Sequence, residues 1–204
     1  MLIIGLTGSI GMGKSTVAAR LRELGVPVFD SDAEVHRLYA AEAVPLIESA
    51  FPGTTVDGKV DRQRLSAAVI AAPEGFKRIE TIIHPLVRQG QRRFLTQARD
   101  RGEALAVLEV PLLFETSAER LVDVTIVVSA PAEMQRARVL ARPGMTPEKL
   151  DVILSRQTPD AEKRARADFV VDTGTVLDET RAQIESIVAR LRGQKGEAFD
   201  LHWR

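Results

Sequence analysis

Cysteine and asparagine are both absent from this sequence, and aromatic residues make up only 4% of it. Without cysteine the chain forms no disulfide, uses no catalytic thiol and binds no cysteine-ligated zinc. Without asparagine it cannot carry the N-K-x-D sequence with which GTPase switches read guanine. No apolar run approaches the ~20 residues that span a bilayer. No basic segment precedes the apolar start of the chain, so we expect neither a membrane span nor a signal peptide.

An excess of charge is also absent, because 28 Lys and Arg residues balance 28 Asp and Glu residues. A general nucleic-acid binder is usually basic, so we expect no nucleic-acid partner. The distribution is uneven, however, since residues 57–102 carry ten basic and five acidic side chains. This basic segment has two interpretations, a solvated helical surface or a binding site for an anionic ligand.

The hydrophobic pattern predicts an α/β fold with a five-stranded parallel sheet. Of the 204 residues, 45% are hydrophobic and 27% charged, as in one globular domain of ordinary composition. Short, nearly continuous apolar runs alternate with longer helical patterns, which is typical of parallel strands covered by helices on both faces. We expect the strands at Leu2–Thr7, Val26–Asp30, Leu105–Val110, Val124–Ser129 and Phe169–Val171.

Helical segments divide the predicted domain into a nucleotide-binding core, an inserted subdomain and a lid. We expect the core at 1–31, 103–130 and 167–192, the helical insertion at 32–102 and the lid at 131–166. Proline predicts breaks in these helices, among them His84-Pro85 in the insertion and Arg142-Pro143-Gly144 in the lid. The tail after residue 192 has no periodicity, so we expect it to be poorly ordered.

One motif carries most of the functional inference. Residues 8–15, here called the P-loop, read G-S-I-G-M-G-K-S and fit G-x-x-x-x-G-K-S between a predicted strand and a predicted helix. Glycines let successive N–H groups turn toward phosphate oxygens, and the helix N-terminus adds partial positive charge. Lys14 would reach the β- and γ-phosphates and Ser15 would ligate Mg²⁺. The motif predicts a nucleoside triphosphate site, in a chain whose length suits a small-molecule kinase.

Carboxylates follow two of the predicted strands. Asp30 and Asp32 come at the end of the second strand, where one could cap the next helix and the other could accept the proton of an acceptor hydroxyl. Glu109 ends the third strand and is a candidate for holding Mg²⁺ through water, with Glu115 as a weaker one. A charged residue at the end of a strand is also often simply solvated, and both interpretations stay open.

The candidate lid contains several arginines, and an arginine that closes over the transferring phosphoryl group stabilises its charge. Arg142 is the preferred candidate because it lies at the predicted break in the helix. His84 precedes Pro85 and stands four residues before Arg88. A packing or capping role is the default for His84, and no two histidines have the spacing of a zinc site.

Taken together, these segments resemble the dephospho-CoA kinase family, over residues 2 to about 190. The resemblance rests on 7–16 (TGSIGMGKST), 29–32 (FDSD), 83–86 (IHPL), 110–115 (VPLLFE), Gln157 and Ala167-Asp168. One departure is Val171-Asp-Thr173-Gly, where the family commonly has an asparagine near the adenine pocket. Another kinase on this fold, or a P-loop regulatory ATPase, is the alternative.

The resemblance implies a three-layer P-loop kinase fold and ATP-dependent phosphorylation of the ribose 3′-hydroxyl of dephospho-CoA. It implies Asp32 as catalytic base, Arg142 as lid arginine, and His84 and Arg88 in the segment that faces the acceptor. ATP would lie on the P-loop and the next residue, through Gly8, Gly11, Met12, Gly13, Lys14, Ser15 and Thr16. We expect Mg²⁺ as cofactor, a cytoplasmic location, and a monomer or small homo-oligomer.

Overall fold

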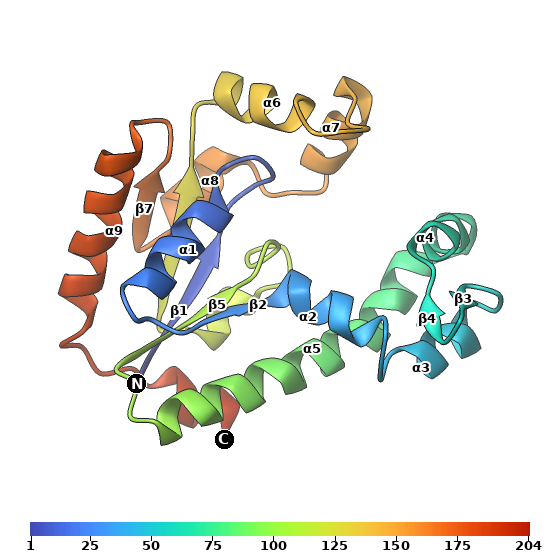
Figure 1. Ribbon diagram of the computed structural model, residues 1–204, viewed down its shortest axis with the longest axis horizontal. Coiled ribbons are helices and arrows are strands. Elements are labelled where there is room, and N and C mark those ends of the chain that lie inside the picture. Colours follow the sequence, from blue (N-terminus) through green and yellow to red (C-terminus); the bar gives the residue numbers. More distant parts are fainter. The chain divides into compact units, whose positions relative to one another are not determined.

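The computed structural model describes residues 1–204 and contains a five-stranded sheet (Figure 1). Its order is β2-β5-β1-β6-β7, and β1 runs parallel to both β5 and β6, as β6 does to β7. The strands are β1 (Leu2–Thr7), β2 (Val28–Asp30), β5 (Leu105–Glu109), β6 (Val124–Ser129) and β7 (Phe169–Asp172). All five predicted strands are confirmed, two of them with the expected bounds.

The chain separates into two compact units, the first made of 1–29 and 95–204 and the second of 30–94. In the first unit, alternate residues Leu2, Ile4 and Leu6 of β1 join a core with helices α1 and α9, while Ile3 is also fully buried. Both faces of the sheet are therefore covered, as the apolar strands require. The helices that belong wholly to this unit are α1 (Lys14–Glu23), α6 (Ala132–Leu140), α7 (Pro147–Leu154), α8 (Asp160–Arg166) and α9 (Leu177–Leu191).

The second unit has a smaller core of its own. It contains α2 (Ser31–Leu38), α3 (Val44–Ala50), α4 (Arg62–Ala71), the hairpin β3 (Thr55–Val56) and β4 (Lys59–Val60), and the first part of α5 (Gly75–Asp100). Leu38, Ile47 and Phe51 are buried here against Leu65 and Ile83. The hairpin was not predicted, although Asp57 and Gly58, both with positive φ, are the residues of a tight two-residue turn.

The predicted break at His84-Pro85 is wrong, because α5 continues through Pro85 to Asp100. Proline removes one backbone hydrogen bond from a helix of 26 residues. Ile83 is buried before it and Leu95 after it, so burial of the apolar face on both sides maintains the helix. No helix of the structure is long and apolar enough to cross a membrane.

The expectation of a poorly ordered tail is also wrong. Phe199 and Trp203, in a short π-helix at Phe199–Trp203, are 5% and 1% exposed. The Trp203 indole N–H donates to the Leu121 carbonyl at 2.7 Å. Asp123 accepts hydrogen bonds from Ile3 N and Ala198 N, which ties the tail to β1. Two buried aromatic side chains order this segment without any helical periodicity that the sequence would reveal.

Candidate active site

The P-loop joins β1 to α1 in a tight turn that requires glycine at two places. Gly11 has φ +78°, and a Cβ there would lie 2.5 Å from Val139 Cγ2 of α6. A Cβ on Gly8 would lie 2.5 Å from the Val128 carbonyl oxygen of β6. The loop is therefore packed closely against β6 and α6, and larger residues at these positions would displace it.

Three alternate carbonyl groups of the loop accept hydrogen bonds from side chains. Lys14 Nζ donates to Gly8 O at 2.8 Å, Gln135 Nε2 to Ile10 O at 2.8 Å, and Thr173 Oγ1 to Met12 O at 2.7 Å. In a trans peptide the C=O and the next N–H point in opposite directions. Holding the Ile10 and Met12 carbonyls therefore directs the N–H groups that follow them the other way, which is the arrangement of an anion-binding nest.

All seven predicted ATP-binding residues lie on this loop and the first turn of α1. Met12 is 2% exposed and its Sδ accepts a hydrogen bond from Ala130 N, so its side chain faces the core and only its backbone faces the loop. Ser15 and Thr16 are exposed in the first turn of α1. The helix N-terminus and the ammonium group of Lys14 supply positive charge beside the nest.

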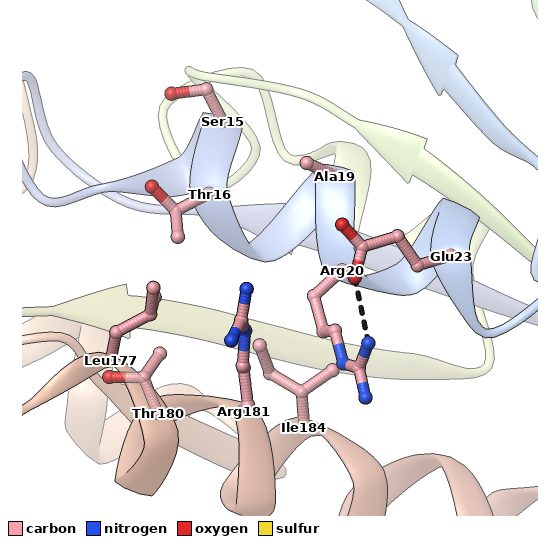
Figure 2. Close-up of a pocket in the computed structure, with 9 residues that line it drawn as sticks. All are labelled: Ser15, Thr16, Ala19, Arg20, Glu23, Leu177, Thr180, Arg181 and Ile184. Atoms are coloured by element: carbon pink, nitrogen blue, oxygen red, sulfur yellow. Dashed lines mark hydrogen bonds and ion pairs between the residues drawn. The ribbon is translucent and has the colours of Figure 1, made fainter.

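A shallow hollow of about 360 Å³ adjoins this turn, between α1 and α9. Figure 2 shows the hydroxyl-bearing side chains of Ser15 and Thr16 on α1 and the guanidinium of Arg181 rising from α9 toward them. At the other end Arg20 forms ion pairs with Glu23 and Glu185, so its charge is already balanced. The end of the hollow near Ser15 is thus the part open to an anionic ligand.

Ser15 and Glu109, the residues predicted to hold Mg²⁺, are oxygen donors that follow or end the parallel strands β1 and β5. Ser15 is the second residue of α1, and Glu109 ends β5 next to Leu6 of β1. No group of three or more acidic or histidine side chains could hold a metal by itself. This donor set fits Mg²⁺, which is usually held by one or two protein oxygens together with substrate phosphates and water.

Glu115, the weaker metal candidate, forms a buried ion pair. Lys163 of α8 is fully buried, and its ammonium lies 2.9 Å from Glu115 Oε1. The Thr158 N–H donates to the same oxygen at 2.7 Å. Burial raises the pKa of the Glu115 carboxyl, but hydrogen bonds from Lys163 and backbone N–H groups outweigh it and leave the pKa below its usual range. The pair attaches α8 to the loop after β5.

The second unit holds Asp30, Asp32, His84 and Arg88. Asp30 is the N-cap of α2, because its Oδ1 accepts from Ala33 N at 2.9 Å. Asp32 is exposed in the first turn of α2, so the capping role falls to Asp30 and leaves the Asp32 carboxylate open. His84, Arg88 and Arg92 are exposed at intervals of four residues along one face of α5. Arg93 lies 3.6 Å from Glu34.

Arg142 follows α6, where the chain turns through Pro143 and Gly144 before α7 begins at Pro147. The predicted break in the lid helices is confirmed, and Gly144 has φ +75° in the turn. The Arg142 side chain is exposed. It is therefore available to a ligand of the first unit, in contrast to Arg138, which donates to both Oγ1 and O of Thr173.

With this geometry described, the relatives of the chain can be named. A model of the dephospho-CoA kinase family matches residues 2–179. A dephospho-CoA kinase of Mesorhizobium japonicum is 58% identical over 196 residues, covering 96% of this chain and 100% of that protein. Another, from Rhodopseudomonas palustris, is 60% identical over 188 residues, covering 92% of this chain and 94% of that protein. The chain belongs to the dephospho-CoA kinase family.

Solved structures share the fold of this chain. A crystal structure from Thermus thermophilus is 39% identical with a TM-score of 0.79, covering 93% of this chain and 97% of that one. A dephospho-CoA kinase from Campylobacter jejuni, at 24% identity and TM-score 0.62, covers 93% of this chain and 96% of that one. A shikimate kinase from Acinetobacter baumannii has TM-score 0.51 at 21% identity, covering 93% and 92%. The last two show the shared fold.

Dephospho-CoA kinases phosphorylate dephospho-CoA with ATP in the final step of coenzyme A biosynthesis, and this is the activity of the chain. The predicted P-loop kinase fold and the predicted reaction are confirmed. The alternatives, a kinase for another metabolite and a regulatory ATPase, are set aside by the identity to curated dephospho-CoA kinases over nearly the whole chain.

Sequence reasoning missed part of the phosphate site of this family member. Gln135 and Thr173 contact the P-loop directly and Arg138 contacts Thr173, yet sequence reasoning counted Arg138 only among the arginines of the lid and assigned no role to Gln135 or Thr173. Gln157 entered only through the family resemblance, and its Oε1 accepts from Ile10 N at 3.1 Å. Thr173 lies in the segment where the sequence departs from the family pattern, and that departure was the one available signal.

Proposed function

We propose that the reaction is carried by the P-loop and by Asp32, with Arg142 assisting. The P-loop N–H groups and Lys14 bind the triphosphate of ATP, and the ribose 3′-hydroxyl of dephospho-CoA is the acceptor. Its oxygen bonds to the γ-phosphorus, the bond from that phosphorus to the β–γ bridging oxygen breaks, and ADP leaves. Asp32 accepts the hydroxyl proton. The observation that carries this proposal is the row of side-chain contacts that shapes the P-loop.

The division of labour between the two aspartates supports the role given to Asp32. Asp30 is occupied by its hydrogen bond to Ala33 N, whereas Asp32 is exposed one turn into α2. A general base must be accessible to the proton that it accepts, so Asp32 is the better candidate of the two.

The basic face of α5 is proposed to bind the acceptor. Dephospho-CoA carries a pyrophosphate, and an arginine binds phosphate oxygens through two parallel N–H bonds. Arg88 and Arg92 follow His84 at intervals of four residues on one exposed face of α5, and Arg93 comes directly after Arg92. This exposed positive charge makes the arginines of α5 the candidate ligands of the pyrophosphate.

Mg²⁺ is the proposed cofactor, held by the Ser15 hydroxyl and, through water, by Glu109. Held there, it would supply positive charge that offsets the negative charge of the phosphates. The 131–166 lid is proposed to place Arg142 over the phosphates and to exclude water, which would otherwise consume ATP. ATP and dephospho-CoA are small and water-soluble, and a cysteine-free chain fits a reducing compartment, so we propose a cytoplasmic monomer or small homo-oligomer.

An acceptor screen tests the proposal. ATP is supplied with dephospho-CoA, AMP, CMP, UMP or pantothenate, and both ADP and phosphorylated acceptor are measured. We expect ADP production only with dephospho-CoA, a product heavier by one phosphate at the 3′ position, and loss of activity with EDTA that Mg²⁺ restores. ADP production independent of acceptor would contradict it, and full activity in EDTA would remove the metal from the proposal.

A further inference from the structure

Two glutamines contact the same residue at the tip of the P-loop. Gln135, in the first turn of α6, donates from Nε2 to Ile10 O at 2.8 Å. Gln157, just after α7, accepts from Ile10 N at 3.1 Å. A backbone N–H only donates and a carbonyl only accepts, so these partners define the orientation of both side-chain amides. The rest of α6 and the whole of α7 lie between the two glutamines in the chain, so both ends of this part of the lid contact Ile10.

Each glutamine is itself held in place by the core of the first unit. Gln135 is 7% exposed, and its backbone N–H donates to the Pro131 carbonyl at 3.0 Å. Gln157 precedes Thr158, whose N–H donates to Glu115, the partner of the buried Lys163. A buried amide without its partner costs free energy, so these contacts belong to a built structure rather than to a mobile surface.

The contacts act on the phosphate site through peptide geometry. The Ile10 carbonyl and the Gly11 N–H belong to one trans peptide, so the hydrogen bond from Gln135 directs the Gly11 N–H to the opposite side. The Ile10 N–H is turned outward to Gln157, while the Ser9 carbonyl of the same peptide accepts from Met12 N at 3.2 Å. Both peptides next to Ile10 are thus oriented by residues of the lid region.

We propose that Gln135 and Gln157 are positioning residues for the donor phosphates, and that they couple the lid to the P-loop. Neither side chain needs to touch ATP. When both contacts are made, the loop has the shape that receives the triphosphate, and when ATP is bound, the same contacts hold the two ends of α6 and α7 against the loop. Coupling between two sites is reciprocal. The effect of the glutamine contacts on ATP binding and the effect of ATP on those contacts are therefore described by the same coupling free energy. This inference rests on the P-loop as the ATP site of the proposed function.

The test replaces each of the two glutamines that contact Ile10 with glutamate. Gln157→Glu keeps an acceptor for the Ile10 N–H, whereas Gln135→Glu offers no donor to the Ile10 carbonyl. Both variants add one carboxyl group in contact with Ile10, so the change in side-chain chemistry is the same in the two. At pH 8 we expect the KM for ATP of Gln135→Glu to exceed that of Gln157→Glu by about tenfold. Equal values, or the reverse order, would overturn the proposal.

Neutral variants separate positioning from general stability. Gln135→Met and Gln157→Met should each raise the KM for ATP by about tenfold and leave the KM for dephospho-CoA within about twofold. A merely structural role would instead change both KM values together, and this result would refute a positioning role. If either Met variant fails to fold, the comparison of the two Glu variants decides.

Hydrogen exchange measures the coupling itself. In the unsubstituted protein a non-hydrolysable ATP analogue should slow amide exchange in 141–156, and in Gln157→Met this slowing should be at least halved at saturating analogue. An unchanged slowing would overturn the coupling. The Lys14→Met variant tests separately whether the P-loop is the ATP site, on which this inference rests. If that variant keeps its ATP affinity, the P-loop assignment fails, whereas loss of affinity in Lys14→Met with no effect of the glutamine variants refutes only the present inference.

Discussion

The Thr173 hydroxyl donates a 2.7 Å hydrogen bond to the Met12 carbonyl across 161 positions of sequence. This contact joins the loop after β7 to the P-loop and turns the Gly13 N–H toward the anion site. Arg138 donates to the Thr173 hydroxyl oxygen and to its carbonyl, so α6 holds the threonine in turn. Thr173 lies in the segment that departs from the family pattern, and its hydrogen bonds join that segment to the P-loop and to α6.

Thr173→Val tests this contact, because valine has nearly the same shape and no hydroxyl. The Met12 carbonyl and Arg138 would lose their partner in a site that is 6% exposed. We expect a loss of stability of about 1 kcal/mol and a rise in the KM for ATP of about fivefold or more. Thr173→Ser keeps the hydroxyl and should keep the KM. Equal behaviour of the two variants in steady-state kinetics would contradict the role.

Replacing each of the two aspartates near β2 should affect a different property, stability at Asp30 and turnover at Asp32. Asp30→Ala removes the N-cap of α2, so we expect unfolding free energy to fall by about 1 kcal/mol with kcat largely kept. Asp32→Asn removes the proposed base and should lower kcat by about a hundredfold or more, with ATP affinity and stability unchanged. Denaturant unfolding, equilibrium ATP binding and steady-state kinetics on both variants check this. A nearly normal kcat for Asp32→Asn would remove it from the mechanism.

Glu115 and Lys163 form an ion pair, and we expect the loss of this pair to account for most of the change in stability when Glu115 is replaced. Glu115→Gln leaves the fully buried Lys163 charge without its partner, and we expect a loss of about 3–5 kcal/mol. The double variant with Lys163→Met removes both charges and should recover most of that loss. Chemical denaturation of the single and double variants gives the coupling energy. Additive losses would show that the two charges do not depend on one another.

The same pair makes stability depend on pH with a defined sign. The pKa of Glu115 is lowered in the folded chain, so its contribution is complete above the unfolded value of about 4.3 and is lost as pH falls through the folded pKa. We expect the stability difference between the native protein and Glu115→Gln to be large at pH 7 and to shrink below about pH 4. Urea titrations at several pH values measure it. A constant difference would exclude ionised Glu115 as the source.

Arg142 and Arg164 offer a matched pair of arginines within 131–166, both exposed. Arg142→Ala should lower kcat by about a hundredfold, because the developing charge on the phosphoryl group loses a compensating cation. Arg164 lies on α8, and Arg164→Ala should leave kcat within about twofold of the unsubstituted value, since most exposed helical arginines are only solvated. Steady-state kinetics at saturating substrates compare them. Equal effects of the two variants on kcat would contradict the proposed role of Arg142 in stabilising the phosphoryl group.

Trp203→Ala tests the packing of the tail. Its side chain is 1% exposed and its indole N–H is bonded to Leu121, so the variant leaves a cavity and an unpaired carbonyl. We expect unfolding free energy to fall by about 3–5 kcal/mol. The exposed neighbour Leu201 serves as control, and Leu201→Ala should cost less than about 0.5 kcal/mol. A small effect at Trp203 would show that the tail contributes little to the fold.

Much of the fold follows from local sequence signals. Apolar β-branched runs predict the five strands, and the glycines and Lys14-Ser15 predict the phosphate loop, because both depend on short-range periodicity and turn geometry. The break after α6 is equally local, since Pro143 and Gly144 lie together. At Pro85 the same reasoning fails, because buried side chains on both sides of the proline outweigh one missing hydrogen bond.

By itself, then, the sequence determined the class of fold and, through the motifs that carry the family resemblance, the reaction, and it predicted the place of the triphosphate. Only the tertiary structure decided which of Asp30 and Asp32 caps a helix, which side chains orient the P-loop, and that the tail is packed. Gln135, Gln157 and Thr173 reach the loop from distant parts of the chain, and no local pattern records such contacts. Their roles depend on which groups the folded backbone brings within hydrogen-bond distance.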